Sequence, residues 1–255
     1  MTGVPAARNV LRMIRFLAEQ TGPTHAATVA RALEIPRSSA YQLLKALQDE
    51  GFVVHFPEER GYALSTLLAE LGTSSDRAAR LRRLGAPLLV KLIARVKLPV
   101  VAQLGILHGH EVVCLAKESA HRAPSLVSEV GVHLPAQLTA TGRAILAHLE
   151  HAQVRALFPD RTSLLARGET GPQTLRELDD QLLETRARGW ALERGEITPG
   201  YASVAAVVLD HNEYATAAIG LTFRTAAIDQ SLVAGLGEAV GVSAAALSMR
   251  LRGKI

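Results

Sequence analysis

The sequence has 255 residues, more than most single domains, and this length favours two domains. Hydrophobic residues make up 48% of the chain and charged residues 20%, a composition that excludes disorder over most of its length. No apolar run reaches the roughly 18 uncharged residues of a membrane span, and no secretory signal is visible. A single cysteine, Cys114, excludes an internal disulfide and a cysteine zinc site. We therefore expect a cytoplasmic protein without membrane contact, cofactor or metal.

The positive charge is concentrated in the first third of the chain. Residues 1–97 contain 14 Lys and Arg against 8 Asp and Glu, whereas residues 98–255 contain 14 against 16. A basic segment attached to a near-neutral one is typical of a module that binds a polyanion. The alternative is an ordinary solvated surface, and charge alone leaves both interpretations open.

The first fifty residues predict three short helices. Apolar residues repeat at helical spacing over residues 5–20, and the Gly22-Pro23 step ends this helix. Thr24 is expected to cap a second helix, which ends at the break over residues 34–36. A third helix is predicted from there to about Glu50.

The third helix has one apolar and one polar face. Ala40, Leu43, Leu44 and Leu47 share the stripe that packs inward. The opposite face carries side chains that bind phosphates and base edges, and none of them is acidic. These candidate DNA-binding residues are Arg37, Ser38, Ser39, Tyr41, Gln42 and Lys45. An ordinary amphipathic helix with a polar outer face is the alternative interpretation.

A hairpin is predicted after the third helix. Residues 52–56 and 62–64 form two short strands around a turn, and Arg60 at its tip is expected to face the DNA backbone. Three helices followed by a hairpin are typical of a winged helix-turn-helix. The stretch from Ala27 to Phe52 resembles the DNA-binding module of the IclR family of bacterial transcription regulators. Similar helix-turn-helix patterns occur in several regulator families, so the family has to be identified from the rest of the chain.

Residues 65–97 predict a helical connector. The segment lacks strand alternation and has seven basic residues against two acidic ones. Gly72 and the cluster at residues 74–76 are expected to divide it into a short and a longer helix. Its cations suit contact with phosphates, but a solvated spacer between two domains is the favoured interpretation. The resemblance to IclR regulators implies a linker helix that contributes to dimerisation.

Two strands with a tight turn are predicted next. Residues 98–107 and 111–117 alternate in polarity, and His108-Gly109-His110 lies between them. A His-x-His pair can supply two metal ligands, but this pair flanks a hairpin turn and the sequence indicates no third ligand. We therefore predict no metal site here. Cys114 is expected to be a buried small hydrophobe.

The segment 131–147 predicts a loop followed by a helix that starts near Thr139 or Ala140. Backbone N–H groups and the hydroxyls of Thr139 and Thr141 then meet at a helix start, which suits a carboxylate. The alternative is helix capping by Thr139 alone. The segment resembles the IclR pattern in which Leu-Pro, small residues and Gly-Lys-Ala open the first effector-domain helix. Arg143 replaces the usual lysine.

Residues 188–210 carry the most specific resemblance to the IclR family. In the family signature an Arg-Gly-aromatic step precedes an acidic residue, a glutamate three positions later, a glycine, a small residue and a strand ending in aspartate. These positions are Glu193, Glu196, Ser203 and Asp210 here, although aspartate is common at the first of them and Leu209 replaces an aromatic residue. A strand over 215–222 and a closing helix over 229–251 complete the resemblance, which covers residues 5–250.

The resemblance implies an α+β fold in three parts. These are a winged helix-turn-helix over 5–66, a linker helix over 67–97, and an effector domain over 98–252 with a GAF-like antiparallel sheet flanked by helices. The expected function is ligand-responsive DNA binding that regulates transcription. The expected partners are double-stranded operator DNA and a small-molecule effector, with the chain forming a homodimer or homotetramer because two half-sites require two-fold symmetry.

The resemblance also implies an effector pocket. Carried over position by position, its residues are Leu134, Ala140, Thr141, Glu193, Ser203, Gly220 and Thr222. Well-known small-acid sensors of the family carry a hydroxyl residue at the position of Gly220, so its absence is expected to open space. We therefore expect an aromatic or hydroxylated organic acid larger than two or three carbons.

An enzyme is the alternative function. Glu193 and Glu196 form a carboxylate pair of the kind that transfers protons, although such pairs are more often structural. No nucleophile motif such as Gly-x-Ser-x-Gly accompanies them. We therefore do not expect catalysis.

Overall fold

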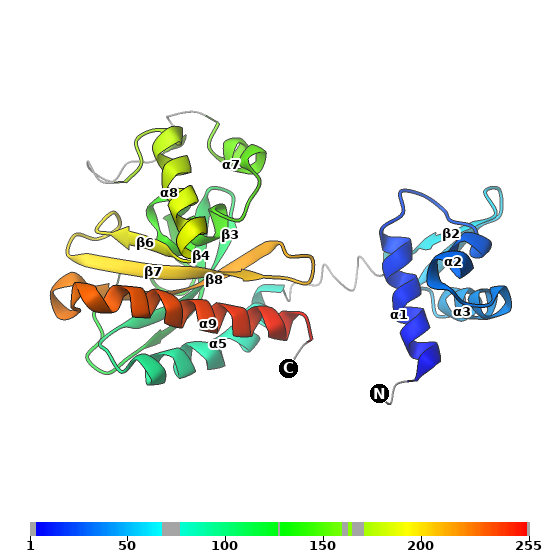
Figure 1. The fold of residues 1–255 in the computed structure, drawn as a ribbon, viewed down its shortest axis with the longest axis horizontal. Coiled ribbons are helices and arrows are strands. Elements are labelled where there is room, and N and C mark those ends of the chain that lie inside the picture. The colour runs from blue at the N-terminus through cyan, green and yellow to red at the C-terminus, as the bar shows by residue number, and fades with distance from the viewer. Residues whose placement is uncertain (1–3, 68–76, 127, 160–162, 165–170, 254–255) are drawn as a thin grey trace. The chain divides into compact units, whose positions relative to one another are not determined.

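A computed structural model describes residues 4–67, 77–126, 128–159, 163–164 and 171–253. The chain divides into two compact units, Met1–Arg77 and Ala78–Ile255 (Figure 1). The first is helical with a small hairpin, and the second is built on a six-stranded sheet. This is the α+β fold class predicted from the sequence.

The first unit contains three helices and a hairpin in the predicted order. Their bounds are α1 Pro5–Ala18, α2 Ala26–Leu33, α3 Arg37–Asp49, β1 Val53–Phe56 and β2 Gly61–Leu64. All three helices and the first strand contribute to one core, which includes Met13, Val29, Leu44 and Val53. The apolar stripe of α3 therefore points inward and its polar face outward, as the helical spacing predicts.

The predicted cap of α2 is wrong. The residue at the cap is His25, with no side-chain hydrogen bond to the helix, whereas Thr24 pairs with the hairpin. The backbone N–H of Thr24 donates to the carbonyl of Tyr62 at 2.9 Å, and the return bond has the same length. Gly61 permits this close approach, because a Cβ there would lie 2.6 Å from the Cβ of Pro23. The hairpin edge binds the Thr24 backbone where sequence reasoning expected a helix cap.

Helix α5, Arg77–Val96, belongs to the second unit from Ala78 onward. Leu81, Leu88, Leu89 and Leu92 of this helix are buried in the core of that unit. Much of the predicted linker thus packs against the sheet as well as joining two parts of the chain. The predicted break at Gly72 and residues 74–76 lies outside the described residues, and the domain boundaries at 66 and 97 stay predictions.

The sheet of the second unit is antiparallel throughout, in the order β5-β4-β3-β8-β7-β6. Its strands are β3 Val101–His108, β4 Glu111–Ser119, β5 His133–Pro135, β6 Ala191–Arg194, β7 Tyr201–Leu209 and β8 Ala215–Arg224. The hairpin predicted around Gly109 joins β3 to β4, with that glycine at a positive φ of 59°. The order places β3, from the start of the domain, beside β8 from its end.

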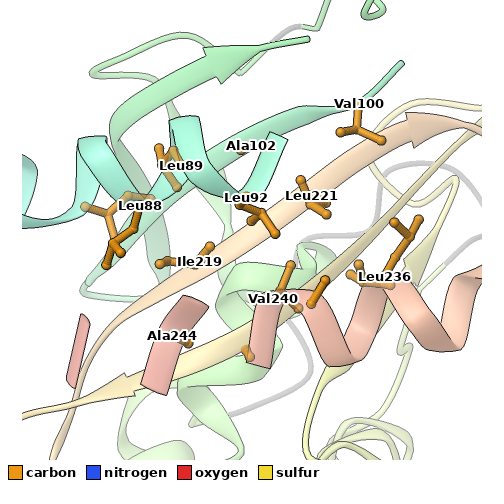
Figure 2. Close-up of a cluster of buried hydrophobic side chains, with 14 of the residues drawn as sticks. Leu88, Leu89, Leu92, Val100, Ala102, Ile219, Leu221, Leu236, Val240 and Ala244 are labelled. Carbon is orange, nitrogen blue, oxygen red and sulfur yellow. The ribbon is translucent and has the colours of Figure 1, made fainter. Parts of the chain in front are cut away.

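The two faces of the sheet have different roles. One is covered by α5 and α9, Val233–Leu251, and Figure 2 shows Leu89 and Val240 from these helices around Ile219 and Leu221 of β8. Because side chains alternate along a strand, the intervening residues of β8 face the other way. Shorter helices pack on that opposite side: α6 Ala140–Leu146, α7 His151–Leu157 and α8 Leu175–Arg188 (Figure 1).

The segment Gln230–Leu251, which includes α9, is long and apolar enough to cross a membrane by composition. In the structure, however, Leu236, Val240 and Leu247 of this helix are buried in the core against the sheet. Its apolar character is that of a core helix.

Candidate functional site

The polar face of α3 is exposed, as expected of a recognition helix. Arg37, Tyr41 and Gln42 are exposed, and so are Ser38 and Lys45, whereas Ser39 is half-buried. A sharp turn precedes the helix, with Glu34 in the left-handed region at φ 56° and Pro36 at the helix cap. A tight turn between two short helices is the geometry that presents a second helix to the major groove.

The wing and α3 border one open groove. Arg37 and Tyr41 of α3 line it together with Arg60 of the wing. Arg31 and Thr28 of α2 line it as well, and the sequence analysis did not select them. The exposed position of Arg31 on an otherwise apolar helix was the signal available for it.

Local contacts hold two of the predicted DNA-binding residues. The His25 Nδ1 lies 2.9 Å from the carbonyl oxygen of Arg60, which ties the wing to the start of α2. The Lys45 ammonium pairs with Asp49 at 2.7 Å, and both side chains are more than half exposed. An exposed pair of this kind is worth roughly 0.3–0.5 kcal/mol, so a phosphate can replace the carboxylate at little cost.

The second unit contains a cavity between the sheet and α6. Its volume is about 60 Å³, compared with the roughly 10–15 Å³ that one water molecule requires. The structure brings all seven predicted effector residues to its wall: Leu134, Ala140, Thr141, Glu193, Ser203, Gly220 and Thr222. It adds Gln103, Ile197 and Tyr201, which the sequence analysis missed. Among the described residues, no Lys, Arg or His lines the cavity.

Four polar side chains form a hydrogen-bonded row on the cavity wall. Glu193, Ser203 and Thr222 lie directly opposite one another on β6, β7 and β8. Ser203 hydrogen-bonds to the Glu193 carboxyl, and the Ser203 and Thr222 hydroxyl oxygens are 2.9 Å apart. The row continues to β3, where the Gln103 amide donates to the Thr222 hydroxyl at 3.3 Å. We call these four residues the polar row.

Glu193 is a buried carboxyl with a perturbed pKa. Its side chain is 3% exposed, and its Oε1 accepts the backbone N–H groups of Glu196 at 2.8 Å and Ile197 at 3.3 Å. Burial and, after it, the charge of Glu196 raise the pKa of Glu193 to about 7, whereas the hydrogen bonds from Ser203 and Ile197 oppose the shift.

Glu196 has a different environment and is held by Arg143. Their ion pair spans 2.9 Å, with side chains 11% and 3% exposed. Arg143 also donates to the carbonyls of Gln137 at 2.7 Å and Leu192 at 3.0 Å, thereby joining α6 to β6. Glu193 lines the cavity and Glu196 does not, so the two carboxylates do not face a common substrate. The structure therefore gives the enzyme alternative no support.

The start of α6 agrees with capping by Thr139 alone. The Thr139 hydroxyl accepts the N–H of Gly142 at 3.0 Å and donates to the carbonyl of Ala136 at 3.3 Å, so its one donor is already used. Thr141 reaches the cavity and its methyl covers Gly220, where a Cβ would lie 3.0 Å from it. The expectation that Gly220 opens space is wrong, because this glycine instead lets α6 approach the sheet.

His108 and Cys114, for which the sequence predicted no role in binding a metal, make local contacts in the structure. His108 makes an edge-to-face ring contact with His133 at 5.8 Å, and the described residues contain no group of three His, Cys, Asp or Glu placed to hold a metal ion. Cys114 is buried, donates its thiol to the carbonyl of Ala116, and has its pKa raised to about 11 by burial. Its thiol is therefore neutral.

Comparison with known proteins identifies the family. Residues 77–249 match the family model described as bacterial transcriptional regulator IclR C-terminal, and residues 6–56 match the IclR helix-turn-helix domain. The chain belongs to the IclR family of bacterial transcription regulators. As an IclR regulator it binds DNA through the first unit and has an effector-binding domain in the second.

Individual relatives agree with this assignment. The chain is 34% identical over 210 residues to the glycerol operon regulatory protein of Streptomyces griseus, covering 82% of this chain and 81% of that protein. It is 28% identical over 251 residues to the HTH-type transcriptional regulator XynR of Escherichia coli, covering 97% of each. An IclR homolog from Microbacterium hydrocarbonoxydans, solved in complex with 4-hydroxybenzoate, shares its fold with a TM-score of 0.61 at 20% identity, over 97% of this chain and 99% of that one.

Proposed function

We propose that this transcription regulator reads its operator with α3 and the wing, and senses its effector in the cavity lined by the polar row. One observation carries the effector half of the proposal. Seven residues predicted from separate parts of the sequence, between Leu134 and Thr222, border a single cavity. A cavity with an apolar wall and a few convergent polar groups is the usual form of a small-molecule site.

On the DNA side, we assign base contacts to Arg37, Tyr41 and Gln42 on the exposed face of α3. Lys45 and Arg60 contact phosphates, and Ser38 and Ser39 bind the backbone at the helix start. Arginine and glutamine can each form two hydrogen bonds with a base edge, worth about 1–3 kcal/mol of discrimination. One such helix covers one half-site, so we propose a homodimer or homotetramer that matches a palindromic operator.

On the effector side, we propose an aromatic or hydroxylated organic acid. Leu134 offers an apolar wall and the polar row offers hydrogen bonds, a combination that suits an amphipathic ligand. 4-Hydroxybenzoate, the compound bound in one solved relative, belongs to this class of acids. We further propose that the protein acts in the cytoplasm. We also propose that it catalyses no reaction, because Arg143 forms an ion pair with Glu196, the second carboxylate of the candidate pair.

The DNA-binding half is tested with a duplex selected in vitro from a random library by the full-length protein. Fluorescence anisotropy at constant salt then compares the wild type with Arg37→Ala and Gln42→Ala. Each variant is expected to lose about 5- to 150-fold in affinity, corresponding to about 1–3 kcal/mol. Gln48→Ala is the matched control, because Gln48 is an exposed glutamine of α3 outside the proposed contact set. Unchanged affinity for both test variants would contradict the placement of α3.

A further inference from the structure

The hydrogen bonds of the polar row take one direction when Glu193 is ionised. When Glu193 is ionised it can only accept, so the Ser203 hydroxyl donates to the Glu193 carboxylate and accepts from Thr222. The Thr222 hydroxyl in turn accepts from the Gln103 amide. With Glu193 ionised, the hydroxyl protons of Ser203 and Thr222 are thus both used within the row, in the direction of Glu193.

The groups of the polar row that remain for a ligand are mostly acceptors. The hydroxyl oxygens of Ser203 and Thr222 each keep a lone pair, since a hydroxyl has one donor and two acceptor sites. The Glu193 carboxylate has about four acceptor sites, of which Ser203 and two backbone N–H groups use three. A ligand that brings donors satisfies these sites, whereas one that brings a second anion leaves them unpaired.

The charge of the cavity favours the same ligand. Among the described residues that line the cavity, Glu193 is the only one with a carboxyl group, and none of them is a cation that could balance its charge. The thiol of Cys114 is neutral and already donates a hydrogen bond to the backbone carbonyl of Ala116. A carboxylate placed against the row would meet a like charge in a buried setting.

From this geometry we infer that the polar row selects effectors by their hydroxyl groups: the effector donates hydroxyl protons to Glu193, Ser203 and Thr222, and any carboxylate it carries lies away from the row. The inference rests on the proposed function, because it assumes that the cavity is the effector site. It narrows the effector class from organic acids in general to hydroxylated compounds, including uncharged polyols.

Matched ligand pairs test this rule. Isothermal titration of the full-length protein would compare 4-hydroxybenzoate with benzoate, glycerate with propionate, and glycerol with propane. A compound that hydrogen-bonds its hydroxyl to a buried charged group is expected to bind about 10- to 100-fold more tightly than its deoxy partner. Glu193→Gln keeps the size of the side chain but removes its charge, so it should reduce this preference at least several-fold.

Glu238→Gln is the matched control, since Glu238 is an exposed glutamate of α9 outside the cavity, and it should leave the preference unchanged. The unfolding midpoint of each unliganded variant shows that it is folded. A tightest binder without a hydroxyl group, or a hydroxyl preference that survives Glu193→Gln, overturns the inference.

The direction of proton transfer on binding gives a second, independent readout. Hydroxyl donors stabilise ionised Glu193 and lower its pKa, so binding near pH 7 should release protons and tighten as the pH rises. A carboxylate against the row would instead raise that pKa and take up protons. The charge that acts on Glu193 from nearby is that of Glu196, which is paired with Arg143 of α6. It is the same for both orientations of the ligand, so it does not change the comparison. Calorimetric titrations in phosphate and Tris buffers, which differ in ionisation enthalpy, show whether binding releases protons or takes them up.

The failure of this inference is distinguishable from failure of the proposed function. If deoxy compounds bind as tightly as hydroxylated ones and Ser203→Phe removes the binding of both, the cavity is the effector site but the hydroxyl rule is wrong. If no hydroxylated compound binds the wild type at millimolar concentration, the rule also fails. Operator binding, measured with the selected duplex, then still decides the DNA-binding half of the proposed function.

Discussion

Arg143 offers a direct test of how the effector domain is held together at the cavity. Its guanidinium bridges α6 and β6 through Glu196 and the carbonyls of Gln137 and Leu192. Arg143→Met keeps much of the side-chain volume and removes the charge. It leaves the Glu196 carboxylate, which is 11% exposed, without its counter-ion. Breaking a buried pair in this way costs about 3–5 kcal/mol of unfolding free energy.

Two further variants separate the charge from the other contacts of Arg143. Arg143→Met combined with Glu196→Gln removes both charges, so it should recover most of the loss and retain about 1–2 kcal/mol for the two carbonyls left without donors. Arg143→Lys keeps the charge, but a single ammonium cannot reach three partners in the directions of a planar fork, so an intermediate loss is expected.

Urea denaturation followed by tryptophan fluorescence measures these differences. Trp190 is the single tryptophan of the chain and precedes β6, so its signal reports the effector domain. A loss below about 1 kcal/mol for Arg143→Met, or a double variant as unstable as the single one, would refute the reasoning.

Two other stability predictions follow from the buried residues. Because the pKa of Glu193 rises from 4.5 to about 7 on folding, the folded carboxyl binds its proton more tightly, and stability should fall by roughly 3 kcal/mol as the pH rises from below 4.5 to above 7. Glu193→Gln should remove much of that fall in urea midpoints between pH 5 and pH 8. Leu89→Ala should cost about 2–5 kcal/mol in the same assay, since Leu89 is 0% exposed, whereas the exposed Val90→Ala should change stability by less than about 0.5 kcal/mol.

The elements could be predicted from the sequence because their signals are local. The apolar stripe of α3, the turn before it and the short alternating strands of the wing are each set by neighbouring residues. The same holds for β8, where alternation alone places Gly220 and Thr222 on one face of the sheet. The resemblance to the IclR family then supplied the cavity residues, which no local pattern connects.

What could not be predicted depends on pairings between distant segments. Gln103 joins the polar row only because β3 lies beside β8, and that neighbour relation is a property of the sheet order. The backbone of Thr24 bonds to Tyr62 of the wing, which a helix-capping rule cannot anticipate. The expectation of open space at Gly220 failed for the same reason, because the Thr141 methyl that fills the space belongs to another element.

One measurement tests most directly whether the cavity controls DNA binding. Fluorescence anisotropy gives the dissociation constant for the selected duplex with and without the compound of the ligand panel that binds the wild type most tightly. We predict a change of at least about tenfold for the wild type, corresponding to about 1.4 kcal/mol of coupling. In Ser203→Phe, whose side chain fills the cavity, we predict no change on adding the compound. An equal response in both proteins, or none in the wild type, would contradict the account.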